Sequence, residues 1–208
     1  MFIKMLFSDP RSFFAILLII SFSISLHELV HTWVALKCGD DTAASNGHLT
    51  LNPLKQMGLF SILMLLFIGI AWGQVPVDES KMKKPYHPAL VAASGPLTNL
   101  VLFVIFTFIT AVTAIYVNDA KFAVNMLTYG AVMNLVLAFF NLLPLPGLDG
   151  WHIIRTFWKP RAKEPGEFVK GATLLLIMML FFGMDFIFKA AYFIFKHFII
   201  FILRNFPA

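Results

Sequence analysis

Residue types that bind metals lie inside an apolar stretch long enough to cross a membrane. The stretch runs from Phe13 to Cys38, and its second half contains His27-Glu28-Leu29-Val30-His31. About 20 predominantly apolar residues span the hydrocarbon core of a bilayer. An ionised side chain at that depth costs at least roughly 2.5–3.5 kcal/mol, so such residues are usually functional. The fold must therefore provide partners for these polar groups.

The spacing of the two histidines predicts a metal site. Residues i and i+4 share one helix face, so His27 and His31 can both reach one ion. Glu28 lies beside them, close enough to hold a metal-bound water and act as a general base. This is the H-E-x-x-H pattern of zinc enzymes. The alternative is a polar seam that hydrogen-bonds neighbouring membrane helices.

The composition indicates an integral membrane protein. Of the 208 residues, 59% are hydrophobic, whereas a soluble domain is nearer half apolar. The net charge of +5 comes from basic residues clustered in loops, so it does not indicate nucleic-acid binding. A single cysteine excludes an internal disulfide framework.

We expect an all-α polytopic membrane protein with five to six transmembrane helices and a small membrane-associated β ribbon. Asp9-Pro10 is typical of a helix start and Gly39 of a helix end, so the first span should lie between them. The predicted spans are 11–38, 89–117 and 122–143, with 168–206 long enough for one or two more.

The whole chain, 1–208, should form one integral membrane domain. Residues 11–150 would make the core that holds the metal site. The basic segment 151–170 is the clearest cytoplasmic marker under the positive-inside rule. Residues 171–208 would add the C-terminal helices.

The β ribbon is expected from two short stretches between the first two long spans. His48-Leu49-Thr50-Leu51 alternates polar and apolar side chains, and Asn52-Pro53 stops it. A strand near the membrane must pair its backbone groups, and Gln74-Val75-Pro76-Val77 is the best partner.

Between those stretches, the apolar run Gly58–Trp72 is too short to cross a bilayer. We expect it to dip in from the cytoplasm and return, or to lie along the interface. This follows if the metal ligands lie toward the cytoplasm, which puts the N-terminus outside. Lys4 and Arg11 favour the opposite orientation. Three ligands must nevertheless converge within ~2.0–2.2 Å of one ion, whereas flanking charges are only a bias.

Asp149 is the natural third ligand. It follows a segment broken by Pro144, Pro146 and Gly147, and a catalytic zinc with two histidines commonly takes a carboxylate and leaves its fourth position open. Taken alone, Asp149 also fits an ordinary turn. His152 is a competing ligand.

Three motifs together resemble the site-2 protease family of intramembrane zinc metalloproteases. They are His27-Glu28-x-x-His31, Ser94-Gly95-Pro96-x-x-Asn99 and Asn141-x-x-Pro144-x-Pro146-x-Leu148-Asp149-Gly150. Segments such as Gly47–Pro53 and Trp72–Val77 resemble the small prokaryotic branch without a PDZ domain. Thr32 and Gly147 depart from the usual Ala and Pro, but neither change removes a ligand.

The resemblance implies one zinc ion per chain, with Glu28 as the base and His27, His31 and Asp149 as ligands. Asn99 and Asn141 would position the substrate or stabilise the oxyanion. An amide in a membrane helix also commonly makes an interhelical hydrogen bond, which is the alternative for Asn99. The strand His48, Leu49, Thr50, Leu51 and Asn52 would catch an extended substrate by strand addition.

The expected function is regulated intramembrane proteolysis at a prokaryotic cell membrane, with the active site toward the cytoplasmic side. The partners would be a transmembrane-helix substrate and the lipid bilayer, without nucleic acid, while the oligomeric state is not indicated. An inactive relative that binds membrane helices and a metal transporter are the other classes. The intact Glu28 argues against both, because neither needs a base beside the ligands.

Overall fold

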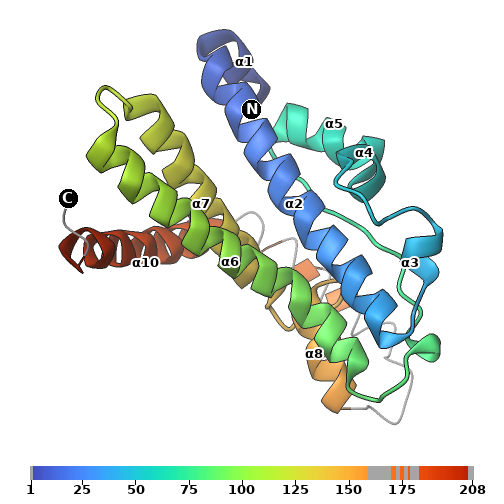
Figure 1. Ribbon diagram of the computed structural model, residues 1–208. Helices are drawn as coiled ribbons and strands as arrows, with labels where there is room; N and C mark the ends of the chain where they lie inside the picture. Colours follow the sequence, from blue (N-terminus) through green and yellow to red (C-terminus); the bar gives the residue numbers. More distant parts are fainter. Residues whose placement is uncertain (1, 159–169, 172–173, 176–177, 179–182, 206–208) are drawn as a thin grey trace.

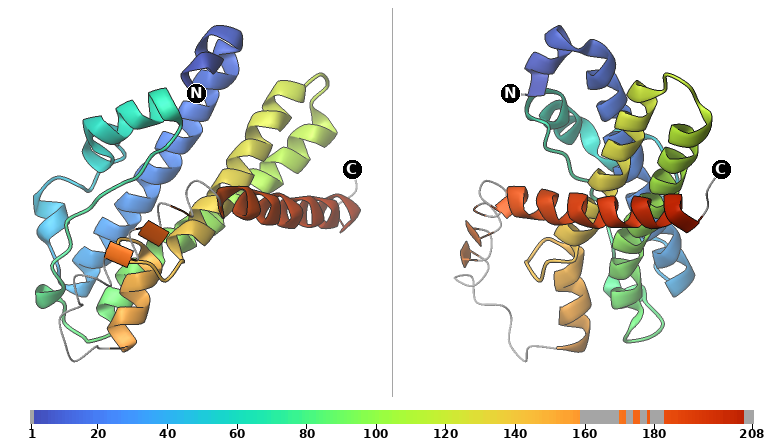
Figure 2. Two further views of the ribbon diagram at one scale, coloured as in Figure 1. Left: turned by 180° about the vertical axis from the view of Figure 1, so that it is seen from behind. Right: turned by 90° about the vertical axis from the view of Figure 1, so that its left-hand side faces the viewer.

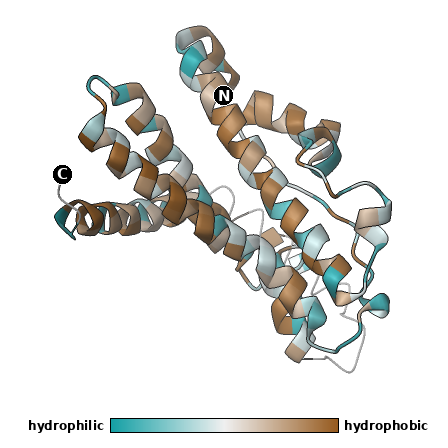
Figure 3. Ribbon diagram, viewed as in Figure 1, coloured by the Kyte–Doolittle hydropathy of each residue, from teal (hydrophilic) through white to brown (hydrophobic). Residues whose placement is uncertain are grey.

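The computed structural model describes residues 2–158, 170–171, 174–175, 178 and 183–205. Within these residues the regular elements are all helical (Figure 1). Four helices are long and apolar enough to cross a membrane, as their hydropathy in Figure 3 illustrates. They are α2 (Pro10–Cys38), α6 (His87–Tyr116), α7 (Lys121–Asn141) and α10 (Met184–Asn205). The shorter helices are η1 (Phe2–Lys4), α1 (Met5–Ser8), α3 (Thr42–Ser45), α4 (Pro53–Gln56), α5 (Gly58–Ile68), η2 (Glu79–Lys81) and α8 (Asp149–Phe157).

The predicted class, an all-α polytopic membrane protein, is confirmed. The predicted spans 11–38, 89–117 and 122–143 end within two residues of α2, α6 and α7. The described residues account for four of the five to six expected spans. Most of 159–182, where a further span was expected, lies outside the described residues.

Local sequence sets both ends of α2. The Asp9 side chain accepts a hydrogen bond from the backbone N–H of Ser12 (3.1 Å), and Pro10 occupies the first helical position. Gly39 ends the helix with φ 111°, a left-handed conformation that residues with a Cβ atom rarely adopt.

The long helices form a bundle in which α6 runs against α2 and α7 turns back beside α6 (Figures 1 and 2). At one end of the bundle, the Arg11 guanidinium lies 3.7 Å from the centre of the Phe122 ring, at the start of α7. At the other end, His87 Nδ1 donates to the carbonyl oxygen of Cys38 (3.0 Å), which joins the start of α6 to the end of α2. Helix α10 packs on α6 and α7.

Residues 40–78 leave the C-terminal end of α2 and return to it. The buried Asp40 carboxylate accepts a hydrogen bond from the backbone N–H of Asp78 (2.7 Å), which ties the two ends of this excursion together. Between them, α5 has eleven residues and a length of about 16 Å. The excursion therefore begins and ends beside the C-terminal end of α2; whether Gly58–Trp72 enters the bilayer stays a prediction.

The predicted β ribbon is wrong, because the described residues contain no strand. The Gln56 side-chain amide donates to the carbonyl oxygens of His48 (2.7 Å) and Thr50 (2.6 Å). A side chain thus occupies acceptors that a neighbouring strand would have used. Gln74 donates its backbone N–H to the carbonyl of Gln56 (3.0 Å), and Gln74–Val77 then runs alongside α2 without a partner strand (Figure 2).

The segment 151–170 is only partly as expected. Its first residues belong to α8 (Asp149–Phe157), so the chain becomes helical immediately after the proline-rich turn. Residues 159–169, which contain most of the expected loop, lie outside the described residues.

Candidate metal centre

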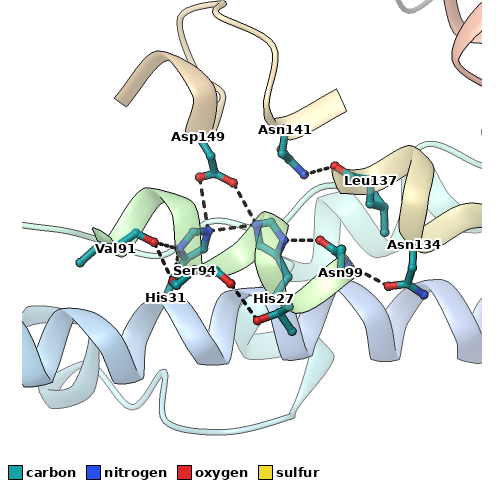
Figure 4. Close-up of polar contacts among 10 residues, drawn as sticks. His27, His31, Val91, Ser94, Asn99, Asn134, Leu137, Asn141 and Asp149 are labelled. Carbon is teal, nitrogen blue, oxygen red and sulfur yellow. Dashed lines mark hydrogen bonds and ion pairs between the residues drawn. The ribbon is translucent and has the colours of Figure 1, made fainter. Parts of the chain in front are cut away.

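The three predicted ligands meet from distant parts of the chain (Figure 4). His27 and His31 project from adjacent turns of α2, with their Nε2 atoms 3.0 Å apart. Asp149, the first residue of α8, places Oδ2 3.2 Å from His27 Nε2 and Oδ1 3.3 Å from His31 Nε2. Both histidines are buried. The structure therefore brings this ligand set to one point.

Gly95 lets α6 approach that point closely. A Cβ atom on Gly95 would collide with the Nε2 atoms of both His27 and His31. The groups that approach Gly95 most closely are the two imidazoles. Any larger residue here would fill the space between the ligands.

Hydrogen bonds on the far side of each imidazole fix its tautomer. His31 Nδ1 lies 2.7 Å from the carbonyl oxygen of Val91, which can only accept, so Nδ1 carries the proton. His27 Nδ1 lies 2.6 Å from the side-chain oxygen of Asn99. Both neutral rings therefore present an Nε2 lone pair to the site, which is the form in which imidazole binds a metal.

The groups that converge here suit a bound cation. The Asp149 carboxylate faces two imidazole nitrogens that, in these tautomers, offer lone pairs to the site and no N–H. Its Oδ2 atom is buried without a hydrogen-bond donor among the described residues. Protonating two buried imidazoles instead would carry a desolvation cost.

The spacing of these atoms suits zinc. Bonds of about 2.0–2.2 Å in tetrahedral geometry place ligand atoms roughly 3.3 Å apart. The two Nε2 atoms are 3.0 Å apart, and each lies 3.2 or 3.3 Å from a different oxygen of the Asp149 carboxylate, which is close to this spacing. The residues present therefore fit the metal that the H-E-x-x-H pattern predicts.

Glu28 lies at the same point, but outside the ligand set. A Cβ atom on Gly73 would collide with the Glu28 carboxylate, so the segment after α5 crosses directly over this side chain. The carboxylate makes no hydrogen bond within the described part of the chain, and it lines two cavities. Such a group is placed to exchange a proton with a molecule in the cavity.

The two cavities share His27 and Glu28 as wall residues. One has a volume of about 370 Å³ and includes the polar side chains of Glu79 and His152 in its wall. The other has a volume of about 440 Å³. Its apolar wall residues include Ile24, Ile70, Leu137 and Phe140. The site therefore has a polar approach and an apolar recess.

Asn99 and Asn141, both predicted to face the substrate, have different surroundings. Asn99 is fully buried, and its oxygen and nitrogen bond to His27 (2.6 Å) and Asn134 (2.9 Å). It therefore has the interhelical role that was the alternative. Asn141 donates one N–H to the carbonyl of Leu137 (3.0 Å) and lines both cavities. Its second N–H has no partner among the residues that the structure describes, and its substrate role stays a prediction.

The turn before α8 places Asp149 against the histidines. Gly150 packs so closely on the carbonyl groups of Leu142 and Leu143 that a Cβ atom there would collide with them. Gly147 has φ 91°, which proline cannot adopt because its ring holds φ near −65°. The conformation of this turn is therefore incompatible with the proline that the family usually has at this position.

The competing ligand and the expected substrate strand do not join the three ligands. His152 Nδ1 is 3.6 Å from a carboxylate oxygen of Glu79, and it does not join the three-ligand group. None of the five residues assigned to a substrate strand, His48, Leu49, Thr50, Leu51 and Asn52, lines either cavity.

Sequence reasoning did not identify Gly73 and Asn134 as parts of the site. Asn134 could have been suspected, because it is a polar residue in a membrane span and shares a helix face with Asn141. Gly73 carries no local signal, since its role depends on how the segment after α5 crosses α2.

The chain matches the family model described as Peptidase family M50 over residues 15–119 and 111–184. It is 36% identical over 176 residues to YwhC of Bacillus subtilis, named as a candidate zinc metalloprotease, covering 81% of this chain and 80% of that protein. Rip2 of Mycolicibacterium smegmatis, also named as a candidate zinc metalloprotease, is 31% identical over 170 residues, covering 76% and 62%. Zinc metalloprotease MJ0392 of Methanocaldococcus jannaschii is 26% identical over 177 residues, covering 81% and 43%. No solved structure matches.

Proposed function

Because the chain belongs to peptidase family M50, the site-2 protease family, we propose that it hydrolyses a peptide bond within a transmembrane segment of another membrane protein. One zinc ion per chain would be held by His27, His31 and Asp149. The observation that carries the proposal is that these ligands converge while Glu28 faces the same cavities.

Each polar group then has a chemical task. Zinc held here would polarise the scissile carbonyl and lower the pKa of a bound water toward ~7. Glu28 takes the proton of the attacking water and passes it to the leaving amine. Its carboxylate is free to do so because no hydrogen bond from the described residues engages it.

Asn141 supplies the donor to the substrate. Its second side-chain N–H reaches the cavity from the end of α7, where it can bond to the oxyanion or to the peptide backbone. A donor of this kind contributes about 3–4 kcal/mol to transition-state stabilisation. Asn99 is 0% exposed and its side-chain oxygen is held by His27, so we do not assign this task to it.

The substrate must be unwound at the scissile bond, because the carbonyl groups of a helix are already hydrogen-bonded. Gly73, Gln74, Val75 and Val77 line the polar cavity and run beside α2 without a partner strand. This segment, rather than His48–Asn52, is placed to pair with an extended peptide. The apolar recess beside it would accept the apolar side chains of a membrane segment.

We assign the site to the cytoplasmic side of a prokaryotic cell membrane. The basic residues at the end of the bundle nearest the site support this orientation under the positive-inside rule. At the opposite end, the Arg11 guanidinium is stacked on an aromatic ring. The basic residues at the end nearest the site, where α2 ends and α6 begins, are Lys37, Lys81, Lys83 and Lys84, and α8 adds Arg155.

The orientation can be tested by labelling single cysteines in a Cys38→Ser background. Ser8→Cys should react with a membrane-impermeant reagent from outside, and Ser45→Cys and Ser80→Cys only from the cytoplasm. Labelling of positions 45 and 80 from opposite sides would show that the excursion crosses the membrane.

The activity is tested by comparing cells that carry wild-type protein with cells that carry Glu28→Gln. New protein ends inside transmembrane segments, mapped by mass spectrometry of membranes, should appear only with the wild type. Purified protein of both kinds should retain about one zinc. Tight zinc without any cleavage would favour a helix-binding relative, and readily exchanging zinc would favour a transporter.

A further inference from the structure

A line of buried polar groups leads away from His27 through three helices (Figure 4). Asn99 on α6 accepts from His27 and donates to Asn134 on α7. Asn134 in turn donates through Nδ2 to Ser23 Oγ on α2 and to the carbonyl oxygen of Gly130, both at 2.9 Å. Asn99, Asn134 and Ser23 are each 0% exposed, so water does not compete for these bonds.

The Gly130 carbonyl, at the end of this line farthest from His27, determines how both asparagine amides are oriented. The Gly130 carbonyl can only accept, so Asn134 must turn its NH2 group toward it. The oxygen of Asn134 then faces Asn99, which must present its own NH2 group there. The Asn99 oxygen is thereby left facing His27 Nδ1, which has to carry the proton.

We propose that Asn134 is a positioning residue for the zinc ligand His27. It holds the Asn99 amide in the orientation that keeps the His27 proton on Nδ1 and the Nε2 lone pair free. This inference rests on the proposed zinc site. A reversed Asn99 amide would point N–H groups at Nδ1 and move the proton to Nε2, where it blocks metal binding. His31 needs no such support, because its Nδ1 donates directly to a backbone carbonyl.

The role of Asn134 can be separated from a general effect on folding. Aspartate has acceptor oxygens at both ends, so in Asn99→Asp the orientation of residue 99 no longer matters. If Asn134 acts through the Asn99 amide, replacing Asn134 should weaken zinc binding in the wild-type background, but not in the Asn99→Asp background. A mere loss of packing would weaken both alike.

The measurement is zinc affinity of purified, detergent-solubilised full-length protein by competition with a chelator. Asn134→Leu should bind zinc about 10- to 100-fold more weakly than wild type, the usual effect of losing a residue that orients a ligand. Asn99→Asp/Asn134→Leu should match Asn99→Asp within about threefold. Ser23→Ala should keep wild-type affinity, because the Gly130 carbonyl still directs the amide.

Thr107→Val is the matched control for loss of a buried polar group. Thr107 is also 0% exposed, lies on the same helix as Asn99, and donates only to the carbonyl of Phe103. Its replacement should leave zinc affinity unchanged. Wild-type affinity in Asn134→Leu, or equal losses in both backgrounds, would overturn the inference.

If Asn134→Leu does not fold, the inference can be tested on the wild-type protein by determining which nitrogen of His27 carries the proton. In metal-free protein with ¹⁵N-labelled histidine, the signals of His27 should show a protonated Nδ1 and an unprotonated Nε2. The opposite tautomer would overturn the inference. Failure of the wild type to bind zinc at all would instead refute the proposed function.

Discussion

Gly95→Ala adds one methyl group at the most crowded point of the site. The Cβ atom would collide with the Nε2 atoms of His27 and His31, which are the atoms that should bind the metal. Helix backbone carries this Cβ, and α6 also supplies Asn99 and the Val91 carbonyl to the two rings. Helix α6 and the imidazole rings therefore cannot move apart without disturbing the hydrogen bonds to Asn99 and to the Val91 carbonyl.

The required movement exceeds what a metal site tolerates. Non-bonded heavy atoms settle at about 3.5 Å or more, so the imidazoles would have to move by roughly 1 Å. Metal–ligand distances hold within about 0.2 Å of their ideal values. Loss of an orienting residue alone costs 10- to 100-fold in affinity. We therefore expect Gly95→Ala to weaken zinc binding at least ~100-fold, or about 2.7 kcal/mol.

The assay is zinc content and chelator competition on protein purified in detergent. Gly171→Ala is the matched control, because it is the same chemical change in a helical residue whose added Cβ would have no atom of the described residues within 4 Å. Gly95→Ala protein that is monodisperse and binds zinc as the wild type does would refute the placement of the two rings against α6.

Three further predictions follow from the same geometry. Asp149→Ala should release zinc, whereas His152→Ala should retain it; the reverse result in metal analysis would show that the ligand set is wrong. Glu28→Gln should keep zinc but lose cleavage by at least ~10²-fold, since it removes only the base, and undiminished cleavage would exclude the mechanism. Gly73→Ala should behave like Glu28→Gln, because the methyl group would displace the carboxylate and no ligand; loss of zinc in this variant would contradict that placement.

The parts of the fold that could be predicted are those governed by local chemistry. Asp9 and Gly39 mark the ends of α2 through a side-chain cap and a left-handed backbone, both of which depend on neighbouring residues alone. The i,i+4 spacing of His27 and His31 likewise follows from helix geometry. The structure adds the distance between their Nε2 atoms, but the shared face needed no tertiary information.

The β ribbon failed because its backbone groups found a different partner. Alternation in His48–Leu51 is a signal for a strand only if another strand supplies donors. Here the donor is the side chain of Gln56, which closes a compact loop with two short hydrogen bonds. Local sequence does not show that a glutamine a few residues later will take the place of a strand.

The asparagines in the membrane helices also have roles that local sequence does not predict. Inside a membrane, every buried polar group needs a partner within the protein. Asn99 and Asn134 bond through both ends of their side chains, which makes them structural. Asn141 is only partly buried, lines both cavities and makes a single side-chain hydrogen bond among the described residues. Sequence spacing places Asn134 and Asn141 on one helix face and cannot separate these roles. Their exposure does: Asn134 is 0% exposed, whereas Asn141 is partly exposed at the cavities, which supports the proposed role of Asn141 as a donor to a bound peptide.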